Sequence, residues 1–425
     1  MKLYVQGWSA LAHYRSPEAR ISVERTGQRQ RKLQDATASI KDIREMHTYR
    51  LGFEDISKKH PIEVLVPNRA KRGSSRLVKP RVWSTPIRGN AFRQVDAEQY
   101  VSSPEFTFLQ LANELSLPEL VALGMELCGT YRRNVALKCI DSDETEHVTE
   151  YHAPILTTPK RIEGFLNAMP KAPGIRAAKE ALRFIVPGSA SPLETAVYLL
   201  LCLPRRLGGY GLPKPKLNPS ITFSKSGRQY TLRHSAKPDL FWRVARLDLE
   251  CNGEESHGEN QRPADSMRRK ALERMKVEVI ELTKEEIYDA GILHAVVLRI
   301  ARRIGKKIRP EHEGSFIEKR NSLRQLVLFD DRGNTWTDPK DLMHSDKSSM
   351  VSEEQGGQSW TADAEGNDAL VESGEWDVVF EEDVDQWSEE WTGDFDGVDP
   401  DFADQLDSEV FDSEGVYVYG GKRIA

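Results

Sequence analysis

Three acidic residues have the types and the spacing to act together. Glu194 follows a helix start at Ser191-Pro192, Asp239 begins one candidate strand, and Glu250 ends the next candidate strand eleven residues later. If those strands are neighbours in one sheet, both carboxylates reach the same end, and Glu194 can join them from the helix. Convergent carboxylates suit Mg²⁺, a hard cation that prefers oxygen ligands and keeps several waters. A bound Mg²⁺ lowers the pKa of a water and offsets charge on a phosphodiester, so the pattern predicts metal-dependent hydrolysis.

The elements that position these acids are readable from local signals. Ser at the N-cap and Pro in the first turn favour a helix from residue 192. A β-hairpin is expected over 221–232 around Gly227, and strands over 237–242 and 245–250. Beyond a polar loop, the pattern predicts a helix over 265–275, a strand over 277–282 and mostly helix over 284–308. We therefore expect an α/β domain over residues 186–309.

The same segment carries an ordered series of short motifs: Ser191-Pro-Leu-Glu194, Lys237-Pro-Asp239-Leu-Phe-Trp242, Leu249-Glu250-Cys-Asn-Gly253, His257, Asp265-x-x-Arg268-Arg269-x-x-Leu272 and Val279-x-x-Leu282-Thr283. The series resembles a small endonuclease-like domain family of unknown function, related to very-short-patch-repair endonucleases. That family belongs to the PD-(D/E)XK restriction-endonuclease-like superfamily. The resemblance covers about residues 186–305 and implies a core with the order α-β-β-β-α-β.

The resemblance implies roles for individual residues. Asp239 and Glu250 are similar to the two metal ligands of the superfamily, which implies Mg²⁺ or Mn²⁺ as cofactor. Glu194 resembles the helix glutamate that some members add. His257 resembles the histidine that follows the second ligand in the smaller family, and Arg268 the helix arginine near the site.

The chain departs from the pattern at Asn252, where the superfamily has Lys and the smaller family commonly has Asp. Asn keeps an oxygen acceptor but carries no charge. The position therefore lacks either a cation that would orient water or a metal carboxylate. Two functions stay open: a Mg²⁺-dependent DNA endonuclease in defence or DNA repair, or a catalytically degenerate nucleic-acid-binding or antitoxin-like regulator. Asp and Asn also favour ordinary turns, which is the simpler interpretation of each residue alone.

A looser resemblance covers about residues 1–135. Ser9-Ala10-Leu11, the strand-rich stretch 64–88 and the motif at 101–112 are similar to proteins related to abortive-infection antitoxins of the AbiEi type. The sequence pattern predicts an α+β accessory domain over 1–150, which a helical connector over 151–185 joins to the next domain. The winged-helix module usual in those antitoxins is not obvious here. We therefore interpret the region as a structural domain, with direct DNA reading as the alternative.

Charge is distributed unevenly along the 425 residues, whose formal net charge is −6. From Ser348 to Gly421 there is no Lys or Arg, while 23 acids fall between Glu353 and Glu414. Because only two cations follow, the first 347 residues carry a net charge of +15. A basic body of this size predicts a polyanionic partner, here DNA.

One predicted helix carries a basic stripe. Arg299, Arg302, Arg303 and Lys306 recur at three- and four-residue spacing, and isoleucines occupy the other face. Such a stripe can contact phosphates without reading sequence. The alternative is a solvated helix face.

Residues 310–425 are expected to form a largely disordered acidic tail, because they are rich in Gly, Ser and Asp. This tail contains four widely spaced tryptophans, Trp360, Trp376, Trp387 and Trp391. Spaced aromatic residues in an acidic stretch are typical of a segment that binds a protein partner. The alternatives are a solubilising tail and an autoinhibitory one that competes with DNA for the basic body.

Several classes are not expected. No apolar run approaches the roughly 18–20 residues of a membrane helix, and no secretory signal is recognisable at the N-terminus. The four cysteines lack paired close spacing, which argues against a disulfide framework and fits a cytoplasmic protein. Neither a Walker loop nor a dinucleotide-binding glycine motif is present in the sequence.

Overall fold

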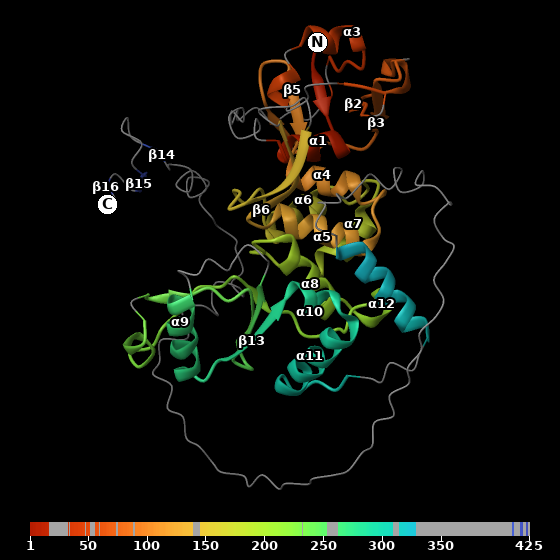
Figure 1. Cartoon of the computed structure of the whole chain (residues 1–425). Helices are drawn as coiled ribbons and strands as arrows, with labels where there is room; N and C mark the ends of the chain where they lie inside the picture. The colour runs from red at the N-terminus through yellow and green to blue at the C-terminus, as the bar shows by residue number, and fades with distance from the viewer. Residues whose placement is uncertain are drawn as a thin grey trace. The chain divides into compact units, whose positions relative to one another are not determined.

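A computed structural model describes residues 1–16, 33, 35–46, 48–51, 56–58, 60–73, 75–87, 90–138, 145–231, 233–252, 262–308, 314–328, 410–411, 417–419 and 422–423 (Figure 1). The chain divides into two compact units, Met1–Lys347 and Ser348–Ala425. In the second unit, a small antiparallel sheet contains β14 (Val410–Phe411), β15 (Tyr417–Tyr419) and β16 (Lys422–Arg423). The predicted disorder of the acidic tail otherwise falls on residues outside those described.

The first unit begins with a five-stranded mixed sheet in the order β3-β2-β1-β5-β4. Its central strand β1 pairs parallel to β5 and antiparallel to β2, and the three residues of β1 are fully buried. Helix α1 contacts both β2 and the later helix α4. The bounds are β1 (Leu3–Val5), α1 (Gly7–Tyr14), α3 (Ile40–Glu45), β2 (Ile62–Val66), β3 (Val78–Val82), β4 (Phe92–Gln94) and β5 (Gln99–Ser102).

A helical layer follows this sheet. Ser103 and Thr158 accept hydrogen bonds from backbone amides at the starts of α4 and α6, and Ser116 forms a capping box with Glu119 at the start of α5. The elements are α4 (Pro104–Leu111), α5 (Leu117–Leu127), the antiparallel pair β6 (Tyr131–Lys138) and β7 (Thr145–Tyr151), α6 (Pro159–Ala168) and α7 (Ile175–Leu182).

The predicted α/β segment contains a four-stranded sheet in the order β13-β12-β11-β8. Strand β12 is antiparallel to β11 and parallel to β13, and β11 is antiparallel to β8. The mixed α/β class is confirmed, but the sheet includes β8, which precedes the segments predicted as strands, and excludes the predicted hairpin over 221–232. The bounds are α8 (Pro192–Cys202), β8 (Lys216–Leu217), β11 (Leu240–Trp242), β12 (Leu247–Asn252), α9 (Arg262–Arg274), β13 (Glu278–Thr283), α10 (Lys284–Tyr288) and α11 (Ala290–Arg303).

The hairpin predicted over 221–232 is wrong in its second strand. β9 (Ile221–Thr222) pairs with β10 (Ser235–Ala236), and the 3-10 helix η4 (Gly227–Gln229) lies between them. The chain does turn at Gly227, as predicted, but the turn is a 3-10 helix and not the tight turn of a hairpin. The wider loop is stabilised by packing on α9, which the local sequence does not reveal.

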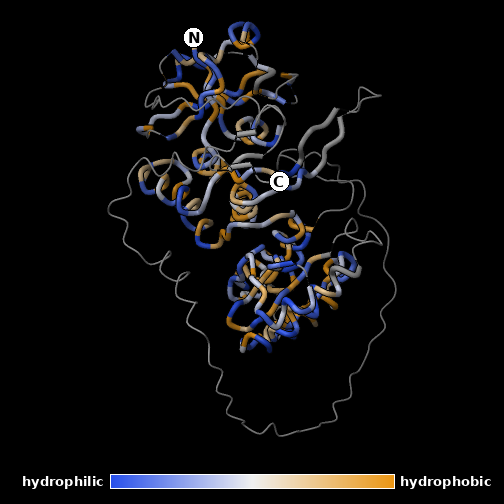
Figure 2. Tube along the Cα trace, turned by 90° about the vertical axis from the view of Figure 1, so that its left-hand side faces the viewer, coloured by the Kyte–Doolittle hydropathy of each residue, from blue (hydrophilic) through white to orange (hydrophobic). Residues whose placement is uncertain are grey.

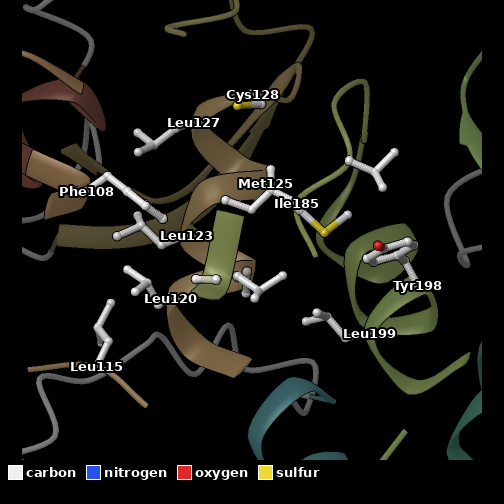
Figure 3. Packing of buried hydrophobic residues seen from close by; sticks show 14 of the residues in the cluster. Phe108, Leu115, Leu120, Leu123, Met125, Leu127, Cys128, Ile185, Tyr198 and Leu199 are labelled. Carbon is white, nitrogen blue, oxygen red and sulfur yellow. The ribbon is translucent and has the colours of Figure 1, made fainter. Parts of the chain in front are cut away.

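One hydrophobic cluster extends through all the segments predicted as separate parts of the body. It includes buried residues of α4, α5, α7, α8 and β12. Figure 3 shows Leu120, Leu123 and Met125 near Ile185 and Leu199 in this cluster. Hydrophobic and hydrophilic residues alternate along the trace of the first unit, as amphipathic elements require (Figure 2). The segments 1–150, 151–185 and 186–309 therefore share buried surface.

Helix α12 (Gly314–Val327) lies within the segment predicted as tail. Phe316, Leu323 and Val327 are buried in the large cluster, and the helix contacts α8 and the 3-10 helix η3 (Arg205–Leu207). Gly208, with φ of 89°, lets the chain pass close to α12. A Cβ at this position would collide with the Lys319 carbonyl oxygen of that helix. The folded part therefore continues past residue 309 to residue 328.

No helix among the described residues is both long and apolar enough to cross a bilayer.

We predict that Leu323→Ala lowers the free energy of unfolding by about 2–4 kcal/mol, because it leaves a cavity in the core. Ile317→Ala on the same helix should cost less than about 1 kcal/mol, since Ile317 is 38% exposed whereas Leu323 is 3% exposed. Urea unfolding of both variants measures the difference. Equal small effects would show that α12 does not pack on the core.

Candidate functional site

Asp239 and Glu250 lie opposite each other across two neighbouring strands. The antiparallel register pairs Leu240 with Leu249, and the same register continued by one residue sets Asp239 against Glu250. The backbone N–H of Cys251 donates to Asp239 Oδ2 at 2.7 Å, which fixes the carboxylate at the strand end. The neighbouring strands that the sequence argument required are therefore present.

Glu194 is buried at the start of α8, where only 6% of the residue is exposed. Its Oε2 accepts hydrogen bonds from the Ala190 N–H at 2.8 Å and from Asn218 Nδ2 at 2.6 Å. Burial raises the pKa of Glu194 to about 7; hydrogen bonds oppose this rise, and the charge of Glu250 adds to it. The dependence on Glu250 couples Glu194 electrostatically to the strand acids.

Asp239 has a pKa raised to about 8. Burial is the main cause, followed by the negative charges of Glu194 and Glu250, while Arg268 and the Cys251 N–H lower it. Glu194 and Glu250 therefore lie near enough to Asp239 for their charges to act on its carboxyl group.

Asp248 is a fourth acid that the sequence argument missed. It precedes Glu250 by two residues on β12, so both side chains lie on the same face. Asp248 is fully buried, and among the described residues no donor reaches either of its carboxylate oxygens. Burial raises its pKa to about 9; the negative charge of Glu250 raises it further, and the charge of Arg268 lowers it. The alternation Leu247-Asp248-Leu249-Glu250 was the available signal.

Arg268 on α9 is the cation that reaches these acids. Its Nη2 donates to Glu250 Oε1, lies 3.7 Å from Asp248 Oδ2, and donates to the Lys237 carbonyl at 3.3 Å. The structure therefore brings Arg268 to the position near the site that the resemblance implied. We call Glu194, Asp239, Asp248 and Glu250 the acid cluster; Arg268 offsets only part of its charge.

Two further site candidates are not placed by side chain. Asn252 ends β12 with its backbone in register with Thr283, and its side chain lies outside the described residues. His257 lies wholly outside them.

Asn218, which the sequence argument did not single out, joins the elements around Glu194. Besides donating to Glu194, its side chain donates to the Gly188 carbonyl at 3.1 Å, and its backbone N–H donates to the Asp239 carbonyl at 3.1 Å. Its φ of 48° is in the left-handed region that Asn tolerates. A positive φ is invisible in the sequence, so no signal could have identified this residue.

The basic stripe of α11 is partly engaged within the protein. Arg299 Nη2 lies 2.7 Å from Glu278 Oε1 and Arg303 Nε lies 3.4 Å from Glu278 Oε2. Lys306 Nζ donates to the Gly211 carbonyl. Arg302 lines a shallow surface pocket together with Lys306. A phosphate would therefore compete with Glu278 and a carbonyl for three of the four predicted contacts.

The donor chemistry of the acid cluster fits a hard divalent cation. All four side chains offer carboxylate oxygens, and the two oxygens of Asp248 are buried without a donor. Within the described ranges, however, no three His, Cys, Asp or Glu side chains are arranged as a ligand set.

Comparison with known proteins identifies no relative: no family model matches the chain, and no curated protein or solved structure matches it.

The raised pKa values set the sign of a pH dependence. The folded protein holds protons on Glu194, Asp239 and Asp248, whereas in an unfolded chain Glu and Asp lose them near their ordinary pKa values of 4.5 and 3.8. These groups therefore favour the folded state most at acidic pH, and their contribution is lost as the pH rises toward about 7 to 9.

We predict that Asp248→Asn removes much of this loss, because the amide cannot ionise. Without divalent cations, the variant should gain at least about 1 kcal/mol of stability relative to wild type between pH 4.5 and pH 8. Urea unfolding at the two pH values measures the gain, with the exposed Glu163→Gln as control. A stability difference that is the same at both pH values would contradict the prediction.

Proposed function

We propose that residues 186–308 form a restriction-endonuclease-like domain that hydrolyses DNA phosphodiester bonds with Mg²⁺ or Mn²⁺. The observation that carries the proposal is the acid cluster, in which an Asp and a Glu face each other on neighbouring strands and a buried glutamate and aspartate are coupled to them. The helix, three strands, helix, strand order of the sheet and its helices supports the same fold.

Asp239 and Glu250 are the residues that would hold the cation, with Glu194 and Asp248 able to add carboxylate oxygens. A bound divalent cation supplies a water of lowered pKa and offsets negative charge on the phosphodiester. The cation would also relieve the mutual repulsion that raises the pKa values of these acids.

The chain's own groups orient the cluster. The Cys251 N–H holds Asp239, while Asn218 and the Ala190 N–H hold Glu194. Arg268 is bonded to Glu250 and can offer its guanidinium fork to a phosphate that enters the site. Arg268 therefore supplies positive charge that the superfamily pattern places at the position of Asn252.

We predict that Asp239→Asn lowers Mg²⁺-dependent nicking of a supercoiled plasmid by at least about 100-fold, while circular dichroism stays near wild type and stability against urea is not reduced. The nearly isosteric change removes a charged oxygen ligand and leaves the backbone contacts intact. Glu163→Gln, an exposed change on α6, should cleave like wild type. Undiminished cleavage by Asp239→Asn would overturn the assignment.

The second candidate is a nucleic-acid-binding regulator without catalysis. It is favoured by the internal contacts of the acids, since Arg268 already bonds Glu250 and two donors already bond Glu194. The same plasmid assay separates the two functions. A regulator shifts the mobility of DNA with Mg²⁺ or Mn²⁺ present and leaves it uncut, whereas an endonuclease nicks it.

A further inference from the structure

The segment between two members of the acid cluster is free of acids and rich in cations. No Asp or Glu occurs between Glu194 and Asp239, whereas eight Lys and Arg residues do. Those eight are Arg205, Arg206, Lys214, Lys216, Lys225, Arg228, Arg233 and Lys237. In a chain with 66 acids, this stretch therefore concentrates positive charge, although Arg206 pairs with Glu180 from α7.

The second half of this segment folds into a small lobe. We call residues 221–237 the basic lobe; they contain β9, η4 and β10. The lobe packs on α9, with Phe223 and Ala236 buried against Ala271 and Leu272. In Figure 1 it is the green segment beside α9. A buried apolar base of this kind holds the lobe in place while its polar side chains face outward.

The cations of the basic lobe are exposed and not used for ion pairing. Lys225, Arg228, Arg233 and Lys237 are all exposed, and in the described part of the chain none of them pairs with a carboxylate. Among the described residues, the Arg228 side chain donates only to the Phe223 carbonyl, through Nε at 3.1 Å. Their charges therefore remain available for a partner.

This availability distinguishes the lobe from the α11 stripe, where Arg299 and Arg303 share Glu278. A phosphate that binds the stripe must displace a carboxylate, while one that binds the lobe displaces only water and counterions. Counterion release favours the second case.

The basic lobe leads directly into the acid cluster. Lys237 is two residues before Asp239, and its carbonyl accepts a hydrogen bond from Arg268, which also bonds Glu250. Cations next to the acid cluster attract a phosphodiester and hold it close to the carboxyl groups.

We propose that the basic lobe binds the phosphate backbone of double-stranded DNA and holds the strand beside the acid cluster. This inference rests on the proposed function in taking DNA as the partner. The contacts are to phosphates and do not read bases, since Lys and Arg side chains on an exposed lobe neutralise charge without a groove-reading element.

The test is binding of a fluorescent 30-base-pair duplex in EDTA, measured by anisotropy over a salt series. The triple variant Lys225→Gln/Arg233→Gln/Lys237→Gln should weaken binding by at least about tenfold near 0.1 M salt and reduce the log–log salt slope by about 3. A charge-matched triple elsewhere, Lys171→Gln/Arg176→Gln/Lys179→Gln, should change affinity less than about threefold, because those exposed cations lie on and beside α7.

The inference is overturned if the two triple variants lose equal DNA affinity, or if the basic-lobe variant keeps the wild-type salt slope. It is also overturned if the wild-type protein does not bind the duplex. Because EDTA removes the metal, the outcome does not depend on catalysis. If wild type fails to cleave yet the lobe triple loses affinity selectively, the endonuclease proposal fails and the lobe remains a DNA-binding surface. If wild type cleaves and both triples bind alike, the endonuclease proposal stands and the lobe proposal fails.

Discussion

The hydrogen-bonded ion pair between Arg268 of α9 and Glu250 of β12 is the interaction on which the candidate site depends. It places one cation beside a strand on which Asp248 is fully buried. Burying several carboxylates together is unfavourable unless they are protonated or paired with cations. The raised pKa values of Asp239 and Asp248 favour their protonated, uncharged forms. Arg268 supplies one cation for pairing. A divalent cation would complete the compensation, which is why the electrostatics of the cluster and the proposed chemistry agree.

The same helix also supports the basic lobe. Ala271 and Leu272 on one face of α9 bury Phe223 and Ala236, while Arg268 reaches the acids. One helix therefore connects a positive surface suited to phosphates with a negative cluster suited to a metal ion. A chain with a net charge of only −6 can therefore place the cations of the basic lobe next to the carboxyl groups of the acid cluster.

The body of the protein is more continuous than its sequence suggested. The large hydrophobic cluster includes residues from the N-terminal helices, from α8 and from α12, so α12 belongs to the fold although it follows a polar stretch. Composition alone placed the start of the tail at residue 310, because the buried residues of α12 are few and widely spaced. Phe316 and Leu323 are recognisable as core residues only in the structure, where α12 contacts α8 and η3.

The sequence by itself determined the start of α8, the strands that carry Asp239 and Glu250, and the helices that follow them. Ser191-Pro192 predicted the start of α8, and the spacing of Asp239 and Glu250 predicted acids meeting at one end of adjacent strands. Local capping and periodicity carry this information because they depend on neighbouring residues only. Tertiary structure decided the rest: the burial of Asp248, the hydrogen bonds of Asn218 and the pairing of Arg299 with Glu278. Whether a charge is buried, paired or free depends on residues distant in the sequence, and only the fold brings those residues together.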